Sequence, residues 1–204
     1  MVMDITSHTL HISQQYNIEL ETIRTHLSEM GGMAQRQVND AIQSLIDADI
    51  ERAEQVVRAD MKVNSMEMTI DEECTRILAR RQPAASDLRL VIAVTKAITD
   101  LERIGDEASK IARQAIAMNK DGLAPRGYIE VRHIGGHVSR MLQDALDAFA
   151  RLDMDLALTV VQTDKQVDME YSTAMRELVT FMIEDPRSIT RVLNIMWSLR
   201  ALER

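Results

Sequence analysis

The second half of the chain repeats the first half at an almost fixed spacing. Over most of the repeat, matching residues recur 104 positions later, and about a third of the aligned positions match without a gap, which chance rarely produces. The clearest matches are Gly31 with Gly135, Gly32 with Gly136, Asp60 with Asp164, and residues 101–103 with residues 202–204. The repeat therefore predicts two similar structural units, which we place at residues 1–121 and 122–204.

Composition and periodicity both favour helices. The chain has 46% apolar residues but only 3% aromatics, 7 Gly and 3 Pro, a pattern typical of an all-helical protein. Apolar residues recur every three or four positions in six segments, near residues 10–47, 50–81, 86–118, 129–150, 153–183 and from 188 onward. We predict an all-α protein of two tandem three-helix bundles, the second incomplete because the chain ends within its last helix.

Charge and cysteine content exclude some classes of protein. The net charge of −8 disfavours nucleic acid and anionic membranes as primary partners. A single cysteine, Cys74, gives no disulfide framework and suits a reducing compartment. The most apolar stretch, residues 88–98, carries Arg89 and Lys96 and is too short to span a bilayer. We therefore expect a cytoplasmic protein.

Acidic residues at helical spacing form the main candidate site. In the first unit they lie four, three and four residues apart on one predicted helix and four apart on the next, at matching distances from the turn that joins the helices. Converging carboxylates repel one another unless a cation binds them, so we predict a metal site of divalent or ferric ions (Fe, Zn, Mn or Mg). The candidate ligands are Asp60, Asn64, Glu67, Asp71, Glu102 and Asp106, with Asp164, Asp168 and Glu203 in the second unit. The alternative is a solvated helix face whose carboxylates pair with Lys62 or Arg103.

Other chemical motifs are weak. Glu130 and His133 have the Glu-x-x-His spacing of di-iron bundles, but such sites use two motifs, so we interpret this one as a solvated helix start. His137 forms no ligand pattern with Cys74. No catalytic motif is found, and we predict that the protein is not an enzyme. A carboxylate-bridged di-iron oxidase or ferroxidase is the alternative, and a plain helical scaffold is a third reading.

Three segments carry a resemblance to a known family. They are residues 11–33, the run Arg81-Gln82-Pro83-Ala84-Ala85-Ser86-Asp87-Leu88-Arg89-Leu90, and the run Leu101-Glu102-Arg103-Ile104-Gly105-Asp106. With these segments the chain resembles the PhoU family, the accessory and regulatory proteins of the phosphate-specific transport system. The family's fold is a pair of three-helix bundles, and its E/D-x-x-x-D motif, a metal site in that family, maps here onto Glu102 and Asp106. The second unit lacks the closing Asp, so we expect a weak or absent site there.

The resemblance also implies a role and partners. It implies a negative regulator of phosphate uptake and of the phosphate-starvation response, acting by contact with a phosphate ABC transporter ATPase and a sensor histidine kinase. We expect a homodimer that reaches the membrane only through these protein partners and binds no nucleic acid. The turn before the third helix offers Asp87 and Arg89 as partner-binding residues. Asp87 serves equally well as a helix cap.

Overall fold

The structure is an all-α protein, as the sequence predicts. The computed structural model describes the backbone of residues 3–121 and 128–204 and the side chains of residues 14–119 and 128–204. Within these ranges the regular elements are α1 (Met3–Asp47), α2 (Ile50–Arg81), α3 (Ala85–Asp121), α4 (Tyr128–Arg151), α5 (Met154–Glu184), the short 3₁₀ helix η1 (Pro186–Ser188) and α6 (Ile189–Glu203). Residues 122–127, where the predicted boundary between the units falls, lie outside the described ranges.

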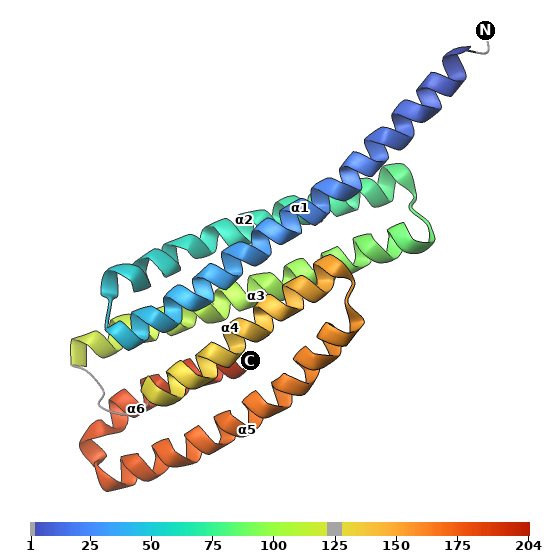
Figure 1. The fold of residues 1–204 in the computed structure, drawn as a ribbon. Coiled ribbons are helices and arrows are strands. Elements are labelled where there is room, and N and C mark those ends of the chain that lie inside the picture. Colours follow the sequence, from blue (N-terminus) through green and yellow to red (C-terminus); the bar gives the residue numbers. More distant parts are fainter. Residues whose placement is uncertain (1–2, 122–127) are drawn as a thin grey trace.

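The helices form two bundles that lie side by side. Helices α1, α2 and α3 pack on one another, and so do α4, α5 and α6, while α1 contacts α4 and α3 contacts α6 across the middle (Figure 1). Buried apolar side chains such as Ile23, Ile98 and Ile195 form one continuous core through both bundles. None of the described helices is long and apolar enough to cross a membrane.

Two helix ends predicted from the positions of proline residues are confirmed. Helix α2 ends at Arg81, Gln82 adopts a left-handed conformation with φ 48°, and Pro83 follows. Helix α5 likewise ends at Glu184, before Pro186. The predicted start of α1 near residue 10 is wrong, because the helix begins at Met3 and its first turns extend beyond the bundle (Figure 1). Residues 3–11 contain neither Gly nor Pro, so nothing in that segment breaks the helix.

Repeated glycines bring the two bundles together. The sequence predicts close packing or a bend at Gly31, and α1 is one unbroken helix with close packing there. A Cβ atom on Gly31 would lie 2.5 Å from Leu146 Cδ2, and a Cβ atom on Gly135 would lie 2.8 Å from Ile42 Cδ1. Gly31 and Gly135 are repeat partners, as are Ile42 and Leu146. Ile42 of the first bundle therefore packs against Gly135 of the second bundle, and Leu146, at the same repeat position, packs against Gly31.

Polar contacts follow the same symmetry. Gln35 Nε2 donates to Gln143 Oε1 at 3.2 Å, and Ser139 Oγ donates to Asn39 Oδ1 at 2.6 Å. Gln35 corresponds to Ser139 in the repeat, and Asn39 corresponds to Gln143. Helices α1 and α4 thus run antiparallel and are related by an approximate twofold axis, the arrangement of a symmetric dimer interface formed within one chain.

The turn between the first two helices of each bundle is also duplicated. Ala48 and Leu152 are left-handed with φ 54° and 55°, and the aspartate that follows each caps the next helix. Asp49 accepts a hydrogen bond from Arg52 N at 3.0 Å, and Asp153 accepts one from Leu156 N at 3.0 Å. The repeat therefore preserves the backbone turn as well as the helices.

Asp153→Ala is expected to lower the free energy of unfolding by about 1 kcal/mol, because it removes the acceptor that caps α5. Chemical denaturation of the purified chain measures this change. Ser172→Ala, at an exposed position of the same helix, is the control and should have little effect. Equal stability of the two variants would show that the cap contributes nothing.

Candidate functional site

Helices α2 and α3 bring four of the predicted carboxylates together. Burial raises the pKa of Asp60, and the charge of Asp106 raises it further. Burial also raises the pKa of Glu102, to which the charges of Asp106, Glu67 and Asp60 add. The charges of Asp106 and Glu67 therefore lie close enough to disfavour the ionisation of Glu102. We call this group of four carboxylates, Asp60, Glu67, Glu102 and Asp106, the first acidic cleft.

Basic side chains lie near this cleft without forming ion pairs with it, and the charge of Arg113 favours the ionised form of Asp60. Within the described part of the chain, none of the four carboxylates forms an ion pair with a lysine or arginine. Arg103 pairs with Asp100 instead, at 3.7 Å, and only weakly favours the charged form of Glu102. The surface ion pairs considered as the alternative are thus absent from these four residues.

Several buried oxygen atoms at the cleft lack a hydrogen-bond partner. They include Asp60 Oδ1 and Asn64 Oδ1 on α2, together with Gln37 Oε1 and Ser109 Oγ beside them. Gln37 and Ser109 lie near enough to Asp60 to favour its charged form, but neither makes a hydrogen bond of good geometry to it. Buried polar atoms are normally satisfied, and carboxylate and amide oxygens are suitable ligands for a hard cation.

Gly105 allows the two helices to approach at this point. A Cβ atom there would lie 3.1 Å from Gln37 Oε1 and 3.5 Å from Asp60 Oδ1. A side chain in place of the glycine within the Leu-Glu-Arg-Ile-Gly-Asp motif would therefore press on Gln37.

Asp71 does not join the first acidic cleft. It is exposed on α2, and its charge adds to the effect of burial in raising the pKa of the Cys74 thiol. The spacing that placed it on the stripe is correct, but this far along α2 the stripe no longer faces Glu102 and Asp106.

The corresponding cleft of the second bundle contains an arginine. Glu203, the counterpart of Glu102, accepts a hydrogen bond from Arg200 Nη1 at 2.9 Å. The same guanidinium lies 6.0 Å from the ring centroid of Tyr171, which replaces Glu67. Asp164 and Asp168 are exposed. Glu203 thus forms an ion pair with Arg200, whereas its counterpart Glu102 forms none among the described residues.

Two acidic residues of the second bundle, Asp164 and Glu203, line a groove between the bundles. The groove has a volume of about 330 Å³ and is also lined by Glu107 and Arg204. Arg204 Nη1 lies 3.5 Å from Glu107 Oε1, so the end of α6 is tied to α3. Here too a basic group balances the acidic residues.

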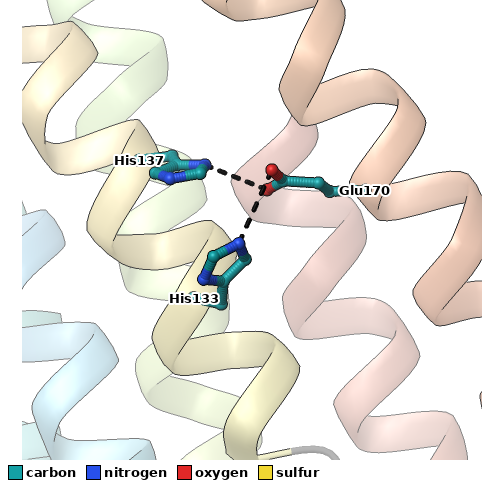
Figure 2. Close-up of side chains that lie close together, drawn as sticks. All are labelled: His133, His137 and Glu170. Carbon is teal, nitrogen blue, oxygen red and sulfur yellow. Dashed lines mark hydrogen bonds and ion pairs between the residues drawn. The ribbon is translucent and has the colours of Figure 1, made fainter.

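A third cluster was missed at the sequence level. His133 and His137 on α4 converge with Glu170 on α5 (Figure 2). Among the described residues this is the one group of three His, Cys, Asp or Glu whose ligand atoms all lie within 4.8 Å of one another. The interpretation of Glu130 and His133 as a solvated helix start is wrong for Glu130, whose Oε2 atom is buried. The signal was the four-residue spacing of the two histidines.

The predicted partner-binding residues differ in exposure. Tyr16 Oη donates to Asp87 Oδ2 at 2.9 Å, so this half-buried carboxylate ties the first turn of α3 to α1. The contact raises the pKa of Tyr16, after burial, which is the larger cause. Arg89 is exposed. Asp87 thus has a structural role, while Arg89 is available to a partner.

Asp60→Asn is expected to stabilise the metal-free protein at pH 7 by about 0.5 kcal/mol, because it removes a charge repelled by its neighbours. The raised pKa of Asp60 means that folding takes up protons between the ordinary and the raised pKa, so stability falls as pH rises through that range. The variant should flatten this slope in urea unfolding measured across it. Glu72→Gln, exposed on the same helix, is the control, and a loss of stability in Asp60→Asn would contradict the account.

Together these features define a class of protein: a helical tandem repeat whose first bundle carries an unbalanced acidic cleft. The PhoU domain family matches residues 27–115 and 131–204. The chain belongs to the PhoU family, and the resemblance noted from its motifs is confirmed.

Relatives and solved structures agree. The chain is 65% identical over 198 residues to the phosphate-specific transport system accessory protein PhoU homolog of Pseudomonas aeruginosa, covering 97% of this chain and 82% of that protein. It is 46% identical to PhoU of Escherichia coli, covering 99% and 83%. The crystal structure of PhoU from Pseudomonas aeruginosa superposes with a TM-score of 0.91 at 64% identity, covering 92% of this chain and 90% of that one. The PhoU structure from Streptococcus pneumoniae gives 0.84 at 28% identity, covering 92% and 88%.

Proposed function

We propose that this protein is a non-enzymatic negative regulator of phosphate uptake and of the phosphate-starvation response. The observation that carries the proposal is the likeness over nearly the whole chain to proteins named as accessory to the phosphate-specific transport system. In this role the chain contacts a phosphate ABC transporter ATPase and a sensor histidine kinase, and it acts by occupying surfaces of these partners.

The first acidic cleft is proposed to hold a metal ion that fixes α2 against α3. Glu102, Asp106, Glu67 and Asp60 supply carboxylates, and Asn64 supplies an amide oxygen. Oxygen donors of this kind suit hard and borderline cations such as Mg, Mn or Fe. The raised pKa values of Asp60 and Glu102 and the unpartnered oxygens support this assignment. The ion would offset the repulsion within the cleft and stiffen the bundle that meets the partners.

The first turns of α3 are proposed as a partner-facing surface. Leu88 and Ile92 are exposed apolar side chains one turn apart, with relative exposures of 36% and 44%, and Arg89 lies beside Leu88. An apolar pair next to a cation suits a protein surface that offers an apolar pocket and a carboxylate.

Co-purification tests this contact. The tagged chain, mixed with the purified transporter ATPase or the cytoplasmic part of the kinase, should retain both, and Arg89→Glu should reduce retention at least tenfold. Arg58→Glu, at the opposite end of α2, replaces an exposed arginine away from this surface and should not. Failure of the unaltered chain to retain either protein would argue against regulation by contact, and equal loss in both variants would argue against this surface.

A carboxylate-bridged oxidase, the alternative function, would consume oxygen as it oxidises ferrous iron, whereas a non-enzymatic regulator would not. Carboxylate-bridged di-iron bundles use two Glu-x-x-His motifs, and this chain carries one, Glu130 with His133. We expect no sustained oxygen consumption when the metal-free chain is mixed with excess ferrous iron. Turnover that Glu130→Gln abolishes would favour the oxidase.

A further inference from the structure

His133, His137 and Glu170 of the second bundle are close enough together to bind one metal ion. No residue of the first acidic cleft belongs to this cluster. His133 and His137 are four residues apart on α4, and their ring centroids lie 4.6 Å apart. His137 Nδ1 lies 2.9 Å from Glu170 Oε2, and His133 Nε2 lies 3.5 Å from Glu170 Oε1. The three side chains point at a common point between α4 and α5 (Figure 2).

Burial and access both suit a bound ion. The side chains of His137 and Glu170 are 16% and 21% exposed, so two of the three ligands are held within the helix pair. The side chain of His133 is 61% exposed, which leaves a path for an ion to enter from solvent. Gln166 Nε2 donates a hydrogen bond to Glu170 Oε1 at 2.9 Å. This contact helps to hold the carboxylate in place between the two histidines.

A nearby carboxylate supplies a second indication of a missing ligand. Glu130 Oε2 is buried and has no hydrogen-bond partner. Glu130 lines the same pocket, of about 290 Å³, as His133, Glu170 and Glu177. An unsatisfied buried acceptor costs free energy, and water bound to an ion in this pocket would provide the donor that it lacks.

The cluster is specific to the second bundle. The repeat partners of His133, His137 and Glu170 are Glu29, Met33 and Met66, which form no such set. The first bundle has instead a single pair, in which His26 Nδ1 lies 2.8 Å from Glu73 Oε2. The His26–Glu73 contact is an ordinary hydrogen bond between two side chains, whereas His133, His137 and Glu170 bring three ligand atoms within 4.8 Å of one another.

We propose that His133, His137 and Glu170 form a transition-metal site that binds Zn²⁺ or a similar borderline ion through three protein ligands. Two imidazoles and one carboxylate are a known ligand set for zinc with an open fourth position. Glu130 lines the pocket beside His133 and Glu170, so its buried oxygen would be able to accept a hydrogen bond from water on the ion. The site differs from the first acidic cleft in ligand chemistry, because nitrogen donors select borderline ions over Mg²⁺ and Ca²⁺. By joining α4 to α5, the ion stabilises the second bundle.

Cobalt substitution of the purified full-length chain tests the proposal. The metal-free protein, titrated with Co²⁺, should develop the intense visible absorption of a four- or five-coordinate ion at about one Co²⁺ per chain, and Zn²⁺ should displace it. His133→Ala, at an exposed position that does not threaten folding, and Glu170→Gln should each weaken binding at least about tenfold. His26→Ala removes a histidine–glutamate contact of the same kind and should leave the titration unchanged.

Three results would overturn the site. The first is the absence of this absorption and of Zn²⁺ binding in the unaltered chain. The second is binding that persists unchanged in both His133→Ala and Glu170→Gln, and the third concerns the first acidic cleft. Glu102→Gln with Asp106→Asn, which alters the first acidic cleft alone, should keep the Co²⁺ spectrum, and its loss there would place the ion in that cleft instead.

Discussion

Replacing Glu102 with glutamine and Asp106 with asparagine is expected to weaken Mn²⁺ binding to the metal-free chain by about 100-fold, because two ionised ligands become neutral. Mn²⁺ is the suitable probe, since oxygen ligands favour it and the histidine cluster does not. The amides preserve side-chain shape, so the loss reports charge and coordination. Equilibrium dialysis or the electron paramagnetic resonance of free Mn²⁺ measures the affinity.

The same double substitution should slightly stabilise the protein when no metal is present. Glu102 is repelled by Asp106, Glu67 and Asp60, and each like-charged pair removed is worth a few tenths of a kcal/mol, about 0.3. Opposite effects on the metal-free and the metal-loaded chain separate a binding site from a purely structural cluster.

The second bundle offers the matched control. Asp164→Asn with Glu203→Gln changes the repeat counterparts of Asp60 and Glu102. Because Arg200 already binds Glu203, this variant should keep the affinity of the unaltered chain. Equal loss of Mn²⁺ in both double variants, or no loss in either, would contradict the assignment to the first acidic cleft.

Gly135→Val is expected to lower the free energy of unfolding by about 1–3 kcal/mol more than Gly136→Val, because overpacking forces neighbouring side chains out of place. A Cβ atom at Gly135 would meet three atoms of Ile42 between 2.8 and 3.2 Å, whereas one at Gly136 would meet nothing within 4 Å. The two adjacent positions share a helix, so helix propensity cancels in the comparison and the difference measures packing between the bundles.

The approximate twofold axis extends this prediction to the first bundle. Gly31→Val should also destabilise more than Gly32→Val, since Gly31 faces Leu146 as Gly135 faces Ile42. Thermal or urea unfolding of the four variants measures both differences. Equal stability within each pair would show that the glycines do not set the contact between α1 and α4.

The sequence predicted the bounds of the helices well. It said much less about which side chains of different helices contact one another. The ends of two helices were predicted from Pro83 and Pro186. The proximity of Glu67 to Glu102 was predicted from their equal distances to the turn between α2 and α3. The repeat indicated two similar bundles but not their packing, because the contacts of Gly31 and Gly135 depend on which faces remain after each core forms.

The candidate sites show the same limit. Spacing placed Asp71 on the acidic stripe, but the structure leaves it exposed on α2. The salt bridge of Arg200 with Glu203 and the convergence of Glu170 on two histidines depend on side-chain direction and on the register between helices. Periodicity within one helix gives neither.

A reporter of the phosphate-starvation response tests most directly whether this chain represses that response, as proposed. The host strain lacks its own copy of the gene, grows in high phosphate, and carries the chain on a plasmid or an empty vector. We expect full reporter expression with the vector and repression with the chain. Expression that stays low without the gene, or stays high when the chain is present at its normal level, would contradict the account.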